Sequence, residues 1–228
     1  VGSWAASLNG QAAPVLDVQT RTRFNEANDS HYYLVPGVIV TIMTMIGALL
    51  TSLVMAREYE RGTLESLFVT PVGSGEILTA KAATNFLLGM VSLAISMIFA
   101  AFVFDIPIRG SLILLLAVSA LFLIVALGLG LVISTATKNQ FLACQFAIMG
   151  TFMPALMLSG FLYDILNMPP AVRAITYIIP ARYYVTLLQT LFLAGDIPSV
   201  IIPCCITLGV FAVVLMGIAR LKAPKSLE

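Results

Sequence analysis

The densest cluster of charged side chains in this sequence lies between residues 57 and 81, which read REYERGTLESLFVTPVGSGEILTAK. Arg61 and Glu65 stand four residues apart, so they can pair on one face of a helix. The apolar residues Leu64, Leu67 and Phe68 fall together on a helical face. Pro71 ends such a helix, because the residue before a proline is pushed out of the α region. The spacing predicts a short amphipathic helix beside the preceding apolar run, with a turn on each side.

The remaining side chains do not predict an enzyme. His31 is the single histidine, and Cys144, Cys204 and Cys205 all lie in apolar runs without a His or Cys at the spacing of metal ligands. We interpret these cysteines as small packing residues and expect no metal site. The sequence has no GxxxxGK[ST] phosphate-binding loop and no nucleophile with a candidate base nearby. We therefore expect no catalytic residue and no ATP hydrolysis from this chain.

The composition predicts an integral membrane protein. Apolar residues make up 60% of the 228 residues, charged residues only 10%, and the mean hydropathy is +1.01, whereas about a quarter of a soluble domain is charged. Five apolar runs are free of Asp, Glu, Lys, Arg and His: 34–56, 82–104, 111–135, 141–163 and 199–219. Each is long enough for a bilayer, which needs ~20 residues, and must be helical to satisfy its backbone there. The prediction is an all-α polytopic membrane protein with five transmembrane helices.

Residues 1–33 differ from the rest because they are polar and mixed. Apolar and polar side chains alternate within residues 14–24, which predicts a strand. One strand cannot make a domain, and the chain starts with Val1 and carries no signal peptide. We interpret this segment as a short remnant, the end of an extracytoplasmic domain in a larger protein that also holds an earlier span.

Loop charges predict the orientation. If the loop 57–81 is cytoplasmic, seven Lys and Arg residues lie inside and five outside, which follows the positive-inside tendency only weakly. Two further regularities agree with this assignment, because all the lysines then lie inside and all the aspartates outside. These residues are Lys81, Lys138, Lys222 and Lys225, against Asp17, Asp29, Asp105, Asp164 and Asp196. The C-terminus is then predicted to be cytoplasmic.

Three stretches make the sequence resemble the ABC-2 family of exporter permeases. They are REYERGTLESLFVTPV with the following GEILTAK, YYLVPG at the start of the first run, and LSGFLYDILNMPPAVRAITYIIPARYY before the last one. The resemblance extends from Asn25 onward. It implies that residues 34–228 form an ABC-2 transmembrane domain with the last five of six spans. It also implies a place in the bacterial inner membrane, in contact with lipid, and a second permease subunit, identical or different.

The resemblance further implies that the loop 57–81 couples the permease to separate ABC ATPase subunits, which would bind the ATP and magnesium; this chain would bind no cofactor itself. The resemblance also implies a periplasmic adaptor protein as a partner. We expect no nucleic acid partner. By position the coupling residues are Glu58, Glu60, Arg61, Gly62, Thr63, Leu64, Glu65, Leu67 and Phe68. The alternative is a helix resting on lipid headgroups, which anionic lipid would disfavour because the segment is rich in Glu.

The segment 164–198 is too rich in proline and polar residues to form a single span. We predict two short helices, 170–178 and 181–193, that dip into the outer leaflet as a re-entrant hairpin; the alternative is a plain interfacial anchor. Asn85 and Gln145 are expected to be buried amides that bond between helices. The residues proposed for a substrate pathway are Met45, Asn85, Gln145, Met149, Met153, Tyr177 and Tyr183.

The small residues Ala126, Gly130 and Ser134 form a ridge on which a second helix can pack closely, within one subunit or between two. The function that these features favour is an ATP-driven exporter permease for an amphipathic or hydrophobic, drug-like or lipid-like compound. One alternative is an ion-coupled carrier, which the lack of ionisable residues in the five runs disfavours. Another is a membrane scaffold or remnant that transports nothing.

Overall fold

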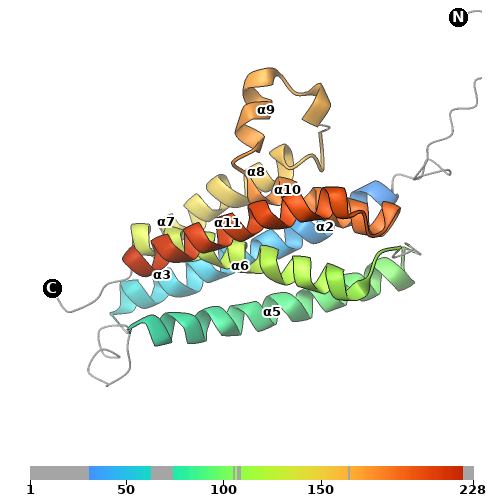
Figure 1. The fold of residues 1–228 in the computed structure, drawn as a ribbon. Helices are drawn as coiled ribbons and strands as arrows, with labels where there is room; N and C mark the ends of the chain where they lie inside the picture. Colours follow the sequence, from blue (N-terminus) through green and yellow to red (C-terminus); the bar gives the residue numbers. More distant parts are fainter. Residues whose placement is uncertain (1–30, 63–73, 105, 107–108, 164, 223–228) are drawn as a thin grey trace, which may run out of the picture.

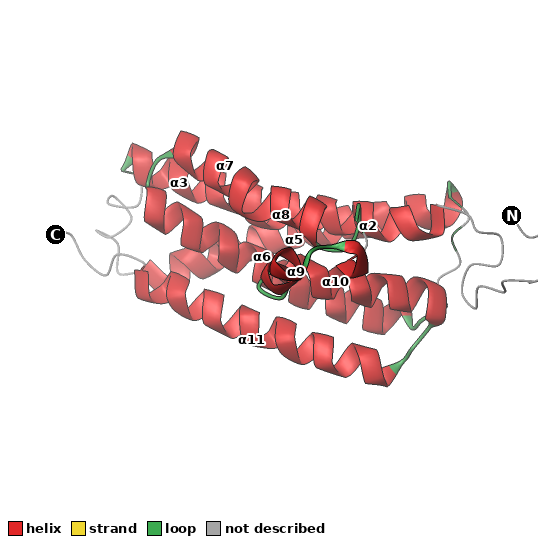
Figure 2. Cartoon of the chain, turned by 90° about the horizontal axis from the view of Figure 1, so that it is seen from above, coloured by secondary structure: helices red, strands yellow, loops and turns green. Residues whose placement is uncertain are grey.

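The fold is a bundle of long helices that run side by side (Figures 1 and 2). The computed structural model describes residues 31–62, 74–104, 106, 109–163 and 165–222, and every regular element in these ranges is a helix. Five of the helices are long and apolar enough to cross a membrane. The predicted all-α polytopic membrane fold is thus confirmed, while the strand predicted within residues 14–24 lies outside the described residues.

The first spanning helix consists of α2 (His31–Thr44), the π-helical stretch η1 (Met45–Leu50) and α3 (Thr51–Arg61). Its backbone stays helical past Ala56, where the first span was predicted to end, so that predicted end is five residues too early. The helix stops at Gly62, which adopts a left-handed conformation with φ of 66° and is the residue type that best tolerates it. The charged residues did not end the helix, and three of them, Arg57, Glu58 and Glu60, bind partners on neighbouring helices.

Four other spans complete the part of the bundle that the structure describes. They are α5 (Ser74–Phe102), α6 (Leu112–Thr137), the segment formed by α7 (Gln140–Ala147), η2 (Ile148–Phe152) and α8 (Met153–Leu158), and α11 (Pro198–Lys222). Between α6 and α7 the chain turns tightly through Lys138, whose φ is 50°. Asn139 then caps α7, because its side chain accepts a hydrogen bond from Leu142 N at 3.1 Å.

Helix α6 is the centre of the bundle. It contacts α11, α3, η1, α5, α10 and α7, and the side chains of Leu115, Leu123 and Leu127 on it are buried. Its small-residue ridge packs inside the chain, against the first span. A Cβ atom at Gly130 would lie only 2.6 Å from the carbonyl oxygen of Ala48, so the two backbones approach closely at this point.

Between the fourth and last spans the chain forms short helices: η3 (Ile165–Asn167), α9 (Pro170–Thr176), α10 (Pro180–Gln189) and the π-helical η4 (Thr190–Ala194). The two helices predicted at 170–178 and 181–193 therefore begin within one residue of those positions. Helix α9 stands out from the side of the bundle (Figure 1), whereas α10 packs against α2, α6 and α11. Tyr184 of α10 is buried, donates to Ser119 Oγ at 2.7 Å and stacks on Phe122 of α6.

Candidate functional site

One candidate site is the end of the bundle where α3 ends and where α5 and α7 begin. Glu58 forms an ion pair with Lys81 of α5. Glu60 accepts a hydrogen bond from the backbone N–H of Gln140, the first residue of α7, at 3.0 Å. A carboxylate suits this position because the first N–H groups of a helix lack partners within the helix and carry partial positive charge. Arg57 Nε also donates to Gln140 Oε1 at 3.4 Å.

These contacts fasten the final turns of α3 to two other spans. Of the predicted coupling residues, Glu58, Glu60 and Arg61 belong to α3 and Gly62 ends it. The other five, Thr63, Leu64, Glu65, Leu67 and Phe68, lie outside the described residues. A force applied to residues beyond Gly62 would act on a helix that runs without a break through the whole first span.

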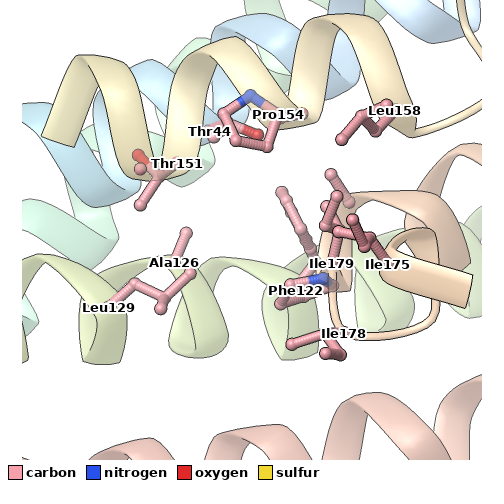
Figure 3. Close-up of a pocket in the computed structure, with 14 residues that line it drawn as sticks. Thr44, Phe122, Ala126, Leu129, Thr151, Pro154, Leu158, Ile175, Ile178 and Ile179 are labelled. Carbon is pink, nitrogen blue, oxygen red and sulfur yellow. The ribbon is translucent and has the colours of Figure 1, made fainter. Parts of the chain in front are cut away.

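A second candidate site is a cavity of about 350 Å³ between four parts of the chain (Figure 3). Helix α6 lines one side, the η2–α8 segment lines another, the α9–α10 corner lines a third, and Thr44 at the end of α2 completes the wall. Its lining residues are Thr44, Phe122, Ala126, Leu129, Gly150, Thr151, Pro154, Ala155, Leu158, Ile175, Ile178, Ile179, Pro180 and Ala181. The volume falls within the range of small-molecule pockets, ~300–1,000 Å³.

The cavity is apolar, and both of its hydroxyl groups are already engaged. Thr44 Oγ1 donates to Val40 O at 2.8 Å, and Thr151 Oγ1 donates to Ala147 O. Both are bonds back to the preceding turn of the same helix, which leave no hydroxyl proton for a ligand. The lining residues include no ionisable side chain.

The predicted pathway residues do not meet in this cavity. Asn85 is buried as expected, but its amide Nδ2 donates to Thr51 Oγ1 at 3.1 Å, which joins α5 to the first span. Gln145 is exposed on the described chain, so the expectation of a buried amide is wrong for this residue. Met45, Met149 and Met153 are 40%, 65% and 47% exposed and are absent from the cavity lining.

The two tyrosines of the predicted pathway do lie together, at the α9–α10 corner. Tyr183 Oη donates to the backbone oxygen of Tyr177 at 2.9 Å. The guanidinium of Arg182 lies 3.9 Å from the centre of the Tyr177 ring and also bonds to Thr176 Oγ1. A side-chain hydrogen bond with Arg182, together with its positive charge, lowers the pKa of Tyr177. This cluster fixes the corner, whose neighbouring isoleucines line the cavity.

The cavity-lining residues that were not predicted show only a weak pattern in the sequence. Ile175, Ile178 and Ile179 are spaced i, i+3 and i+4, the pattern of one apolar helical face. Pro154 interrupts hydrogen bonding in its helix because it has no N–H, and the π-helical η2 ends two residues before it. Nothing in the spacing indicates that Phe122, far away in the chain, faces these residues.

Comparison with known proteins shows the family. The model of the ABC-2 type transporter family matches residues 9–193. The chain is 48% identical over 224 residues to the probable multidrug ABC transporter permease YbhS of Escherichia coli strain K12, an alignment that covers 98% of this chain and 59% of that protein. It is 31% identical over 180 residues to the probable permease YbhR of the same strain, covering 78% of this chain and 48% of that protein.

A third relative, the inner membrane transport permease YhhJ of Escherichia coli strain K12, is 28% identical over 228 residues, which is all of this chain and 61% of that protein. The chain thus spans between about half and three fifths of the length of these three relatives. The family model covers most of the chain, including the first four spans and the α9–α10 hairpin. The chain therefore belongs to the ABC-2 type transporter family.

Proposed function

We propose that the chain is the membrane-spanning part of an ATP-driven exporter permease in a bacterial inner membrane. Separate ATPase subunits dock on the loop after the first span, and a second permease subunit completes the pathway. The cargo is an amphipathic or hydrophobic compound. The observation that carries the proposal is the 48% identity to a relative named as a probable multidrug ABC transporter permease, over 98% of this chain.

The contacts at the end of α3 support a coupling role for this loop. The helix reaches Arg61 without interruption, and its last turns are joined to α5 through Lys81 and to α7 through Gln140. A partner that pulls on the loop would move three spans together. The apolar cavity supports the class of cargo, because it offers hydrocarbon surface and no fixed charge.

The test is a binding and ATP-turnover assay on the whole permease purified with candidate ATPases from its own host. Glu65→Lys combined with Leu67→Asp reverses a charge and places a charge on the predicted apolar face of the loop. We expect this variant to lose ATPase binding while it keeps its elution profile in detergent. The matched control is Arg220→Glu, which reverses an exposed charge two residues before the end of α11 and should leave binding intact. That end of α11 lies at the same end of the bundle as the end of α3 (Figure 1).

A double variant that binds and turns over ATP like the unchanged protein would overturn the coupling assignment. If no ATPase binds the unchanged permease, the whole exporter proposal fails. An ion-coupled carrier or a membrane scaffold needs no ATPase, so both alternatives predict that no ATPase binds the unchanged permease.

A further inference from the structure

We propose that the cavity between α6, η2–α8 and the α9–α10 corner is a binding site for an uncharged hydrocarbon chain or ring that enters from the bilayer. The site lies within one subunit. The same chemistry has two sources, a lipid acyl chain or the apolar part of a cargo molecule. The cargo source rests on the proposed export function, whereas the binding itself does not.

The lining determines the class of ligand. Ile175, Ile178 and Ile179 lie near Phe122, and Leu158 lies on the opposite side of the space (Figure 3). The walls are thus hydrocarbon and one aromatic ring. The hydroxyl protons of Thr44 and Thr151 are donated to their own helices. A charged group entering this space would lose its hydration without gaining an ion pair or a donated hydrogen bond from the lining side chains. The cavity therefore selects against charge and in favour of hydrocarbon.

Glycine 150 provides a way to fill the cavity without disturbing its walls. It lines the space, and a Cβ atom added to it would meet no atom within 4 Å. A side chain at this position would thus extend into open space, in the middle of η2. Gly209 and Gly217 on α11 are equally free of neighbours at the Cβ position but do not line the cavity. They serve as matched controls, because the same substitution at either position adds the same side chain to a spanning helix but outside the cavity.

The experiment is photolabelling in proteoliposomes, without ATPase or nucleotide. One arm uses a phospholipid with a diazirine near the end of an acyl chain, and the other uses a single-chain alkyl alcohol with the same diazirine. Mass spectrometry then locates the labelled peptides. We expect saturable labelling of the segments around Gly150–Leu158 and Ile175–Ala181, decreasing through the series Gly150→Ala, Gly150→Leu and Gly150→Phe until it is lost. Gly209→Phe should be labelled like the unchanged protein.

The two arms distinguish the sources. Labelling by the lipid that the alcohol cannot displace identifies a resident lipid, while labelling by the alcohol, or its competition with the lipid, identifies a site open to cargo. A third probe carries a carboxylate beside the diazirine and should label these segments poorly. Ile179→Trp enlarges a half-buried residue of the cavity lining in the α9–α10 corner, so the proposal stays testable if Gly150→Phe does not fold.

Three results would overturn the inference: no saturable labelling of the two segments, labelling that is unchanged in the filled variants, or equal labelling by the carboxylate probe. Each leaves the ATPase-binding assay of the proposed function unaffected. Conversely, a permease that binds no ATPase would still show the labelling, because the readout needs neither ATP nor transport. The two proposals therefore fail separately.

Discussion

At the scale of single residues, the hydrogen bond from Asn85 to Thr51 is the clearest polar link between two spans. Asn85 is 5% exposed, and the two side chains join α5 to α3 at 3.1 Å. Bonds of this kind in membrane proteins contribute about 0.6 kcal/mol on average and up to about 1.7 kcal/mol. We expect a double-mutant cycle of Asn85→Ala and Thr51→Val to give a coupling energy in that range, measured by SDS-induced unfolding.

A control for this cycle comes from Thr207, whose hydroxyl donates to Pro203 O in its own helix at 2.8 Å. Thr207→Val has the same chemistry as Thr51→Val but no described contact with Asn85. Its coupling to Asn85→Ala should be close to zero. An equal coupling energy for the two threonines would mean that the effect of Asn85 is spread through the bundle and that its bond to Thr51 is not special.

Gly130 gives a second prediction, which concerns packing. A Cβ atom there would lie 2.6 Å from Ala48 O and 2.9 Å from Thr51 Cβ, so even one methyl group must push the first span away from α6. We expect Gly130→Ala to destabilise the protein by about 1–3 kcal/mol, the usual effect of overpacking. The measurement is the thermal midpoint in detergent. Gly217→Ala, where nothing lies within 4 Å, should match or slightly exceed the unchanged protein because alanine favours a helix.

At the scale of elements, the ion pair between Glu58 and Lys81 holds the end of α3 against the first turns of α5. Their side chains are 17% and 31% exposed, so the pair is partly shielded from water and should contribute more than a fully exposed one. We expect Glu58→Lys to destabilise the protein by about 1–3 kcal/mol, and Lys81→Glu to act similarly. The double reversal should restore much of the stability. If the stability lost in the double variant equals the sum of the losses in the two single variants, the two side chains do not interact directly.

The sequence predicted the elements well where one physical requirement decides them. Each bilayer crossing needs about 20 apolar residues, and the five runs lie within the five long helices or overlap most of them. The two hairpin helices were predicted because residues 164–198 hold too many prolines and polar residues for a single span. Pro170 and Pro180 stand in the first turns of α9 and α10, where a proline is tolerated. The end of the first helix was placed too early, because the apolar run stops at Ala56 while α3 continues to Arg61.

The candidate site was far less predictable, because it depends on which faces meet. The cavity joins Thr44, Phe122, Gly150 and Ile178 from four separate segments, and no local pattern encodes that meeting. Gln145 shows the same limit, since an amide in an apolar run is equally compatible with a buried or an exposed face of its helix. The positions of the π-helical stretches η1, η2 and η4 were not predicted either, because no residue pattern in the sequence marks them.

At the scale of the whole molecule, two spans touch both candidate sites. The first span contributes Thr44 to the cavity wall and carries Arg57 and Glu60 near its end. The α7–η2–α8 segment begins at Gln140, which contacts Arg57 and Glu60 at the end of α3. Further along, its Gly150 and Thr151 line the cavity. A displacement of the loop after the first span would thus reach the cavity through the first span itself and through the α7–η2–α8 segment. In that segment η2, whose π-helical hydrogen bonds interrupt the α-helical pattern, is the place where the helix would bend most easily.

This arrangement requires a definite orientation in the membrane, which gives the last prediction. In a variant whose three cysteines are replaced by alanine, Ala136→Cys places one thiol near the turn before α7, and Tyr177→Cys places one in the hairpin; both positions are exposed. A membrane-impermeant maleimide added to intact cells should label position 177 and not position 136, and inverted vesicles should give the reverse. Since cytoplasmic ATPases can only reach a loop on their own side, labelling of position 136 from outside would exclude the coupling role of residues 57–81 whatever the family of the protein.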